Sequence, residues 1–125
     1  YFDKGFDYLE DEKWQLAIKN FTKAIELENP NNEEYFLNFY NRGVAYVNLE
    51  KWQETIDDNT RAIELNPDYA SAYINRSIAK YELNINPCSD YQKACQLRMI
   101  LGLHQVLKCC VILPTVQVQP IQLSR

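Results

Sequence analysis

The sequence states one stretch of residues twice. "EKWQLAIKNFTKAIELENP" at 12–30 and "EKWQETIDDNTRAIELNP" at 50–67 are nearly identical, with one extra residue before the first proline. Trp14 matches Trp52 at a spacing of 38 residues (52 − 14), and the apolar positions that follow keep this spacing. They recur every three to four residues, which predicts an amphipathic helix in each copy. We therefore expect the chain to fold by stacking similar helical units.

A second series of residues precedes each copy. "NRGVAYVNLEKW", which begins at Asn41, is echoed by "NRSIAKYELNIN" from Asn75 at a spacing of 34 (75 − 41), and "DKGFDYLEDEKW" from Asp3 has the same frame. Gly5 and Gly43 fall at one place in this frame, and a serine takes that place in the third copy. A short side chain lets one helix approach its partner closely, which offsets the cost of about 1 kcal/mol that glycine carries in a helix.

The second helix is also present a third time. "SDYQKACQL" lies on the earlier copy at a spacing of 32, so that Asp58 meets Asp90 (90 − 58). The first two copies are expected to end near Pro30 and Pro67, because proline disfavours helical geometry in the residue before it. The sequence therefore predicts an all-α fold of three helix–turn–helix units.

These features resemble the tetratricopeptide repeat, which has a period near 34 residues, glycine then tyrosine in its first helix, alanines in its second and a terminal proline. The resemblance covers roughly residues 1–97 and implies a right-handed superhelical stack. It places the repeats at approximately 1–32, 33–68 and 69–97. The stretch "SDYQKACQL" looks similar to bacterial members of the family.

The resemblance implies a concave face lined by the first helix of every repeat, where such stacks bind extended or helical peptides. Asparagine amides both donate and accept, so we expect two of them to pair with the backbone of a bound peptide. The alternative is that the same residues are buried against a neighbouring repeat or the chain's own tail. The residues predicted to form this peptide-binding groove are Phe2, Phe6, Tyr40, Asn41, Val44, Ile74, Asn75, Ile78 and Tyr81.

One specialisation of the family is not expected here. Some members grip the acidic C-terminal tail of heat-shock chaperones with lysines, asparagines and an arginine on their first helices. The matching places hold Phe2 and Phe6 in the first repeat and Ser71 and Asn75 in the third, and only Asn41 fits. An adaptor for chaperone tails is therefore not predicted.

Nothing in the sequence predicts catalysis or a cofactor. The single histidine, His104, lies outside the repeats, and the sequence lacks a Gly-rich phosphate loop and a nucleophile with a placed base. The adjacent carboxylates Asp57 and Asp58 are interpreted as part of a solvated helix face. A net charge of −4 without a basic cluster argues against a nucleic-acid partner, and no apolar run approaches the ~20 residues of a membrane-spanning helix. We expect no enzyme, no nucleic-acid binding and no membrane insertion.

The four cysteines do not predict a metal site. Cys88 and Cys95 take the places of apolar residues in the earlier copies, so both are expected in the core. Cys109-Cys110 with His104 lacks a two-plus-two zinc spacing. Unpaired buried thiols favour a reducing compartment and hence the cytoplasm. The chain begins at Tyr1, inside a patterned segment, so it looks like a fragment of a longer chain, and a signal sequence ahead of it stays open as the alternative to the cytoplasm.

The composition changes near the end of the third repeat. All 17 acidic residues lie at or before Asp90, and residues 98–125 predict an apolar C-terminal capping helix or tail. This segment is either a native cap or dimer interface, or the product of a reading frame that slipped near Arg98. The function predicted first is a non-catalytic scaffold that binds a peptide or protein segment. The alternatives are a regulatory or docking segment of a larger multidomain protein, and a self-associating structural piece that forms a homodimer through the tail.

Overall fold

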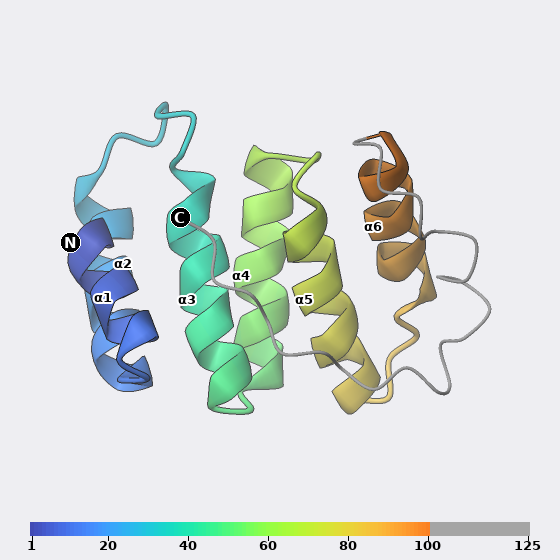
Figure 1. Ribbon diagram of the computed structural model, residues 1–125, viewed down its shortest axis with the longest axis horizontal. Helices are drawn as coiled ribbons and strands as arrows, with labels where there is room; N and C mark the ends of the chain where they lie inside the picture. The colour runs from blue at the N-terminus through green and yellow to red at the C-terminus, as the bar shows by residue number, and fades with distance from the viewer. Residues whose placement is uncertain (101–125) are drawn as a thin grey trace.

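The computed structural model describes residues 1–100, with side chains described as far as Arg98, and every regular element in that range is an α-helix. The helices are α1 (Phe2–Glu10), α2 (Trp14–Leu27), α3 (Phe36–Asn48), α4 (Trp52–Leu65), α5 (Ala70–Glu82) and α6 (Cys88–Ile100). They form three hairpins, α1–α2, α3–α4 and α5–α6, each of which packs on the next in chain order (Figure 1). This confirms the predicted all-α stack of repeated hairpins.

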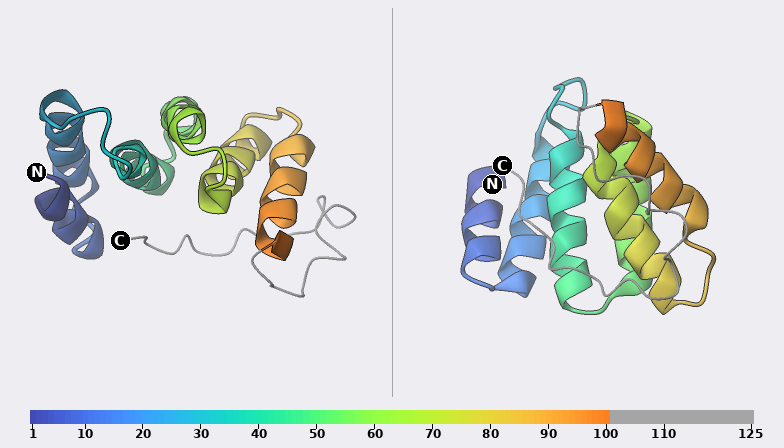
Figure 2. Two further views of the ribbon diagram at one scale, coloured as in Figure 1. Left: turned by 90° about the horizontal axis from the view of Figure 1, so that it is seen from above. Right: turned by 45° about the vertical axis from the view of Figure 1, so that its right-hand side comes forward.

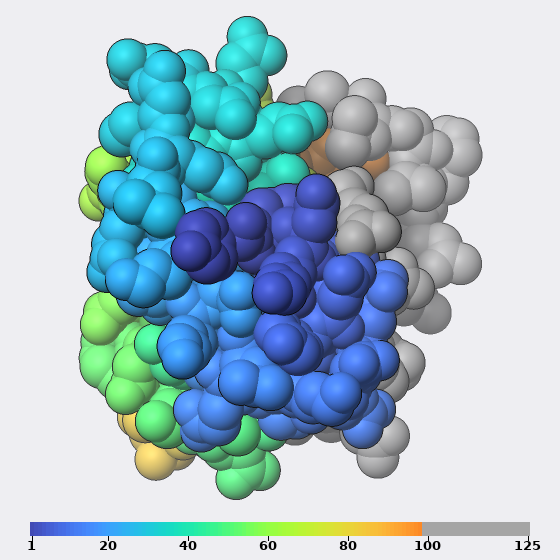
Figure 3. All heavy atoms as spheres, turned by 90° about the vertical axis from the view of Figure 1, so that its left-hand side faces the viewer, coloured from blue at the N-terminus to red at the C-terminus, as the bar shows by residue number. Residues whose placement is uncertain are grey.

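The row of hairpins is curved, and the first helices lie on its inner side. α1 contacts α3 and α3 contacts α5, whereas α2 makes no contact with α4, nor α4 with α6, among the described residues. Helices on the inside of a bend come closer together than those on the outside. Figure 2 shows α1, α3 and α5 on one side of the row and α2 and α4 on the other. We call α1, α3 and α5 the inner layer. Figure 3 looks onto the N-terminal end of the row, which α1 and α2 form.

The end of the third repeat differs slightly from the prediction. α6 continues to Ile100, past the predicted end of the repeat at Leu97. The rest of the predicted cap or tail, 98–125, lies outside the described residues from position 101 onward, as do His104 and Cys109-Cys110. The homodimer predicted through that tail therefore stays a prediction.

Every hairpin turns through a residue with a left-handed backbone. Glu12, Glu50 and Asn84 have φ angles of 57°, 56° and 58° at equivalent places. The next amide then bonds to a carbonyl five residues back, as from Lys51 to Tyr46 at 2.9 Å, and this closes the first helix. Asparagine tolerates the left-handed region well, whereas glutamate is strained there by roughly 1–2 kcal/mol.

A half-buried arginine joins each later hairpin to the one before it. Arg42 in α3 donates from Nε and Nη2 to the carboxylate of Asp58 in α4, at 2.8 and 2.7 Å. Its Nη1 also donates to Oγ1 of Thr22 in α2, at 3.1 Å. The side chain therefore ties its own second helix to the second helix of the preceding hairpin. We call this three-residue contact the junction clamp.

The next junction repeats the clamp. Arg76 in α5 donates to the carboxylate of Asp90 in α6 at 2.9 and 2.6 Å, and to Oγ1 of Thr60 in α4 at 3.1 Å. Lys80 adds a second cation, with its Nζ 2.8 Å from Asp90 Oδ2. The sequence analysis missed both clamps, although the arginine, aspartate and threonine each recur at the repeat spacing.

The interpretation of Asp58 as part of a solvated face is therefore wrong. Asp58 is 5 % exposed and bonded to Arg42, whereas its neighbour Asp57 is exposed. Adjacent residues on a helix point about 100° apart, so one can face the junction while the other faces solvent. The pairing of two acids in sequence carried no information about which one is buried.

The left-handed turn gives the first prediction. Replacing Glu50 by glycine removes the strain of a side chain at φ 56°, but glycine loses more backbone entropy on folding. We expect Glu50→Gly to raise the free energy of unfolding by about 0.5 kcal/mol in urea denaturation. Glu54→Gly, in the first turn of α4, is the matched control and is expected to lower it. A loss of stability in both variants would contradict the role of the turn.

The two clamps differ in how they bind protons, which gives the second prediction. Burial raises the pKa of Asp58 above its usual range in spite of the Arg42 hydrogen bonds. Burial acts in the same direction on Asp90, but hydrogen bonds from Arg76 and Lys80 outweigh it and lower the pKa of Asp90. The ionised form of Asp90 therefore stabilises the fold, and that stability is present above the unfolded pKa of about 3.9 and is lost as the pH falls through the lower folded pKa.

We expect Asp90→Asn to lower the free energy of unfolding at pH 7 by about 3–5 kcal/mol, because it leaves two cations without their carboxylate. Asp58→Asn is expected to cost less. Because the pKa of Asp58 is raised in the folded state, protonation of Asp58 favours the fold. This contribution to stability is fully present below the unfolded pKa and is lost as the pH rises through the raised folded pKa. Urea denaturation between pH 3 and pH 7 measures both. A gap between Asp90→Asn and the native chain that does not shrink at low pH would contradict the assignment.

Candidate functional site

The glycine positions show which side of each first helix is covered by its own second helix. A Cβ atom on Gly43 would lie 2.7 Å from Nδ2 of Asn59 in α4, and one on Gly5 would lie 2.9 Å from the Phe21 ring in α2. These helices thus approach as closely as the recurring small residue predicts. A residue two positions earlier is turned by about 200° around the helix, so it lies on the opposite side, which is the inner face of the row.

Three polar residues occupy that position. Asp3, Asn41 and Asn75 stand two residues before Gly5, Gly43 and the equivalent serine. Asp3 is exposed, whereas Asn41 and Asn75 are 0 % and 1 % exposed. Each helix of the inner layer contributes one of these residues, and we call the three of them the polar ladder.

The two asparagines of the polar ladder carry buried atoms that the fold does not satisfy. Neither Nδ2 nor Oδ1 of Asn41 has a hydrogen-bond partner, and neither does Nδ2 of Asn75. A buried polar group without a partner costs about 1–3 kcal/mol. Among the described residues Asn38 and Asn59 also leave a buried Oδ1 without a donor, but only the two ladder asparagines leave a buried Nδ2 without an acceptor. Native proteins leave few such groups, so two at equivalent positions indicate a role outside folding.

Part of the predicted groove belongs to the core. Phe6, Tyr40 and Val44 are 3 %, 1 % and 1 % exposed and lie in the main hydrophobic cluster. The Tyr40 ring meets the ring of Tyr69, just before α5, edge-on at 4.9 Å between centroids. The alternative interpretation, burial against a neighbouring repeat, therefore describes Tyr40.

The remaining apolar residues of the predicted groove retain accessible surface. Phe2 is half-buried, with its ring centroid 5.7 Å from that of Phe21. Ile74 and Ile78 on α5 are also half-buried, and Tyr81 is 52 % exposed. The structure thus separates nine residues that the sequence treats as one surface, because core and lining positions share the same helical spacing.

The cysteine predictions are confirmed in part. Cys95 is buried, as expected, but Cys88 is only half-buried. Cys88 has a free thiol, whereas Cys95 has a partner, so the expectation of unpaired thiols does not extend to Cys95. Within residues 1–100, no group of three or more histidine, cysteine or acidic side chains is placed to hold a metal ion. No helix in the same range is long and apolar enough to cross a membrane.

Comparison with known proteins agrees with this geometry. A profile of the tetratricopeptide repeat matches residues 39–69, the hairpin of α3 and α4 with the loop to α5. The second tetratricopeptide domain of human RPAP3, solved in complex with the HSP70 peptide SGPTIEEVD, is 26 % identical with a TM-score of 0.73. That match covers 91 % of this chain and 92 % of the other. Residues 39–69 match a tetratricopeptide repeat, and the described helices as a whole are similar in fold to a tetratricopeptide domain.

A second tetratricopeptide domain of similar structure is that of Arabidopsis OM64. It is 25 % identical with a TM-score of 0.63, and the match covers 89 % of this chain and 85 % of the other. No curated protein matches the chain in sequence. The tetratricopeptide repeat mediates protein–protein interaction, and in this chain the matched hairpin contains Asn41 of the polar ladder.

The polar ladder gives the third prediction. Leucine has nearly the shape of asparagine and no polar atoms, so Asn41→Leu removes two buried groups that lack partners. We expect it to raise the free energy of unfolding by about 1–3 kcal/mol in urea denaturation. Asn38 is the matched control, because it is equally buried on α3 but donates from Nδ2 to Glu28 at 2.7 Å. Asn38→Leu should lower the stability, and a loss in both variants would show that Asn41 serves the fold.

Proposed function

We propose that this chain is a non-catalytic interaction module whose inner layer binds an extended segment of a partner protein. The observation that carries the proposal is the pair of buried amides of Asn41 and Asn75 at equivalent positions, in which both polar atoms of Asn41 and Nδ2 of Asn75 lack a partner. An extended peptide has backbone N–H and C=O groups without internal partners. Each asparagine amide can both donate to and accept from such a backbone, whatever the peptide's side chains are.

The apolar residues beside the ladder supply the second part of the proposed site. Phe2 lies on α1 and Ile74, Ile78 and Tyr81 lie on α5, so accessible apolar surface flanks the asparagines on both sides. Side chains of an extended segment point alternately to opposite faces, so every second one can contact this surface. The peptide in the complex of the RPAP3 domain supports a peptide as the class of partner.

Peptide selection followed by titration tests this function and gives the fourth prediction. Extended peptides would be selected on the immobilised chain and their dissociation constants measured calorimetrically. We expect Asn41→Ala and Asn75→Ala each to weaken binding about tenfold, the effect of leaving peptide backbone groups without their partner. Asn20→Ala is the matched control, because Asn20 lies on α2 and donates only to its own helix, at Leu16. Binding that is equal in all three variants would place the site elsewhere.

A further inference from the structure

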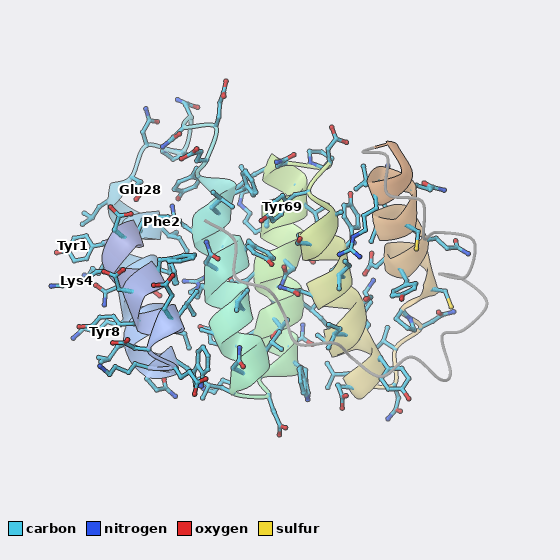
Figure 4. All side chains as sticks on the ribbon, in the orientation of Figure 1. Tyr1, Phe2, Lys4, Tyr8, Glu28 and Tyr69 are labelled. Carbon is cyan, nitrogen blue, oxygen red and sulfur yellow. The ribbon has the colours of Figure 1, made fainter. Side chains whose placement is uncertain are left out.

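The basic side chains of the inner layer are turned away from its inner face. Arg42 and Arg76 each bond a buried carboxylate through two nitrogens, and Lys80 pairs with the second of these carboxylates. Lys4 is exposed on α1, and Figure 4 shows it directed away from α3. In the described part of the chain, α1, α3 and α5 contain no other lysine or arginine.

The charge on the polar ladder is negative. Asp3 is an acidic residue in the first turn of α1. It is exposed, and the described residues offer it no hydrogen bond or ion pair. The ladder thus presents a carboxylate on α1 and neutral amides at Asn41 and Asn75 on α3 and α5.

We infer that the inner face binds an extended, otherwise uncharged segment that places a lysine or arginine against Asp3, and that it discriminates against acidic segments. This inference rests on the proposed function and adds the chemistry of the partner. The basic side chain meets the one unpaired charge of the ladder, while the partner's backbone meets Asn41 and Asn75. An acidic segment would find no cation on this face and would be repelled by Asp3.

The contrast with the RPAP3 complex follows from the same charges. Its peptide, SGPTIEEVD, carries three acidic side chains and a terminal carboxylate. In the present chain the arginines of α3 and α5 are held by Asp58 and Asp90, so they cannot meet such carboxylates without leaving buried acids unpaired. The likeness of fold therefore does not extend to the charge of the partner.

Four fluorescein-labelled probes test the inference by polarisation on the full chain. Three probes are pools of peptides equal in length to SGPTIEEVD, in which the central residue is fixed as lysine, alanine or glutamate and every other position is uncharged. The fourth probe is SGPTIEEVD itself. We expect the lysine pool to bind about two- to fivefold more tightly than the alanine pool, the range of one exposed ion pair. The glutamate pool and SGPTIEEVD should bind more weakly than alanine, and added salt should reduce these differences.

Two variants of Asp3 show where the preference arises. Asp3→Asn should abolish it, and Asp3→Lys should reverse it. Asp57→Lys on α4 is the matched control, because it changes the net charge equally on an exposed residue of the outer side and should leave the order of the probes unchanged. Circular dichroism would establish that each variant folds.

The outcomes separate this inference from the proposed function. Binding that depends on Asn41 but is equal for lysine and glutamate pools, or tightest for SGPTIEEVD, would overturn the charge preference alone. A preference that Asp57→Lys changes as much as Asp3→Lys would also overturn it, because the effect would then come from net charge. Absence of binding by every pool, or binding that Asn41→Ala leaves unaltered, would overturn the proposed function and with it this inference.

Discussion

The junction clamp is the contact on which the stack depends. Arg42 holds Asp58 of its own hairpin and Thr22 of the preceding one, and Arg76 does the same with Asp90 and Thr60. Each hairpin alone leaves an apolar face uncovered, so the stack must fix how neighbours meet. A guanidinium with donors in a rigid fork sets both distance and direction, which apolar contacts do not.

The clamp also determines what the inner layer can offer a partner. Asn41 and Arg42 are adjacent in sequence and about 100° apart around α3. The arginine enters the junction, where its charge is paired, and the asparagine lies on the inner face, where its amide is not. The same division holds for Asn75 and Arg76. Stability and the proposed binding therefore use neighbouring residues without sharing them, and the charge required by the fold is kept from the proposed binding face.

The sequence predicts the hairpins well because their apolar spacing and prolines act locally. The sequence also places Asn41 and Asn75 in the proposed site, since they recur with the glycine frame. Exposure and burial stayed open as alternatives for both, because exposure depends on neighbouring helices whose distance the pattern does not contain. The clamp could have been predicted from the recurrence of Arg42 and Arg76, had the acids been compared at the repeat spacing instead of as an adjacent pair.

The first hairpin shows how one substitution changes both surfaces. Lys4 stands at the place of Arg42 (42 − 38), but Asn20 stands at the place of Asp58 (58 − 38). Because α2 has no carboxylate at the place of Asp58, a cation buried at the place of Arg42 would lose its hydration without gaining a partner, and Lys4 is exposed. The ladder residue beside it is Asp3 where the later repeats have asparagine. A carboxylate on the inner face is tolerated here because it stays in water, whereas at the positions of Asn41 and Asn75 it would be a buried charge without a partner. Because the other two positions are buried, only the α1 position of the ladder can be a carboxylate. The proposed binding face is therefore negative at α1 and neutral at α3 and α5, so its two ends differ in charge.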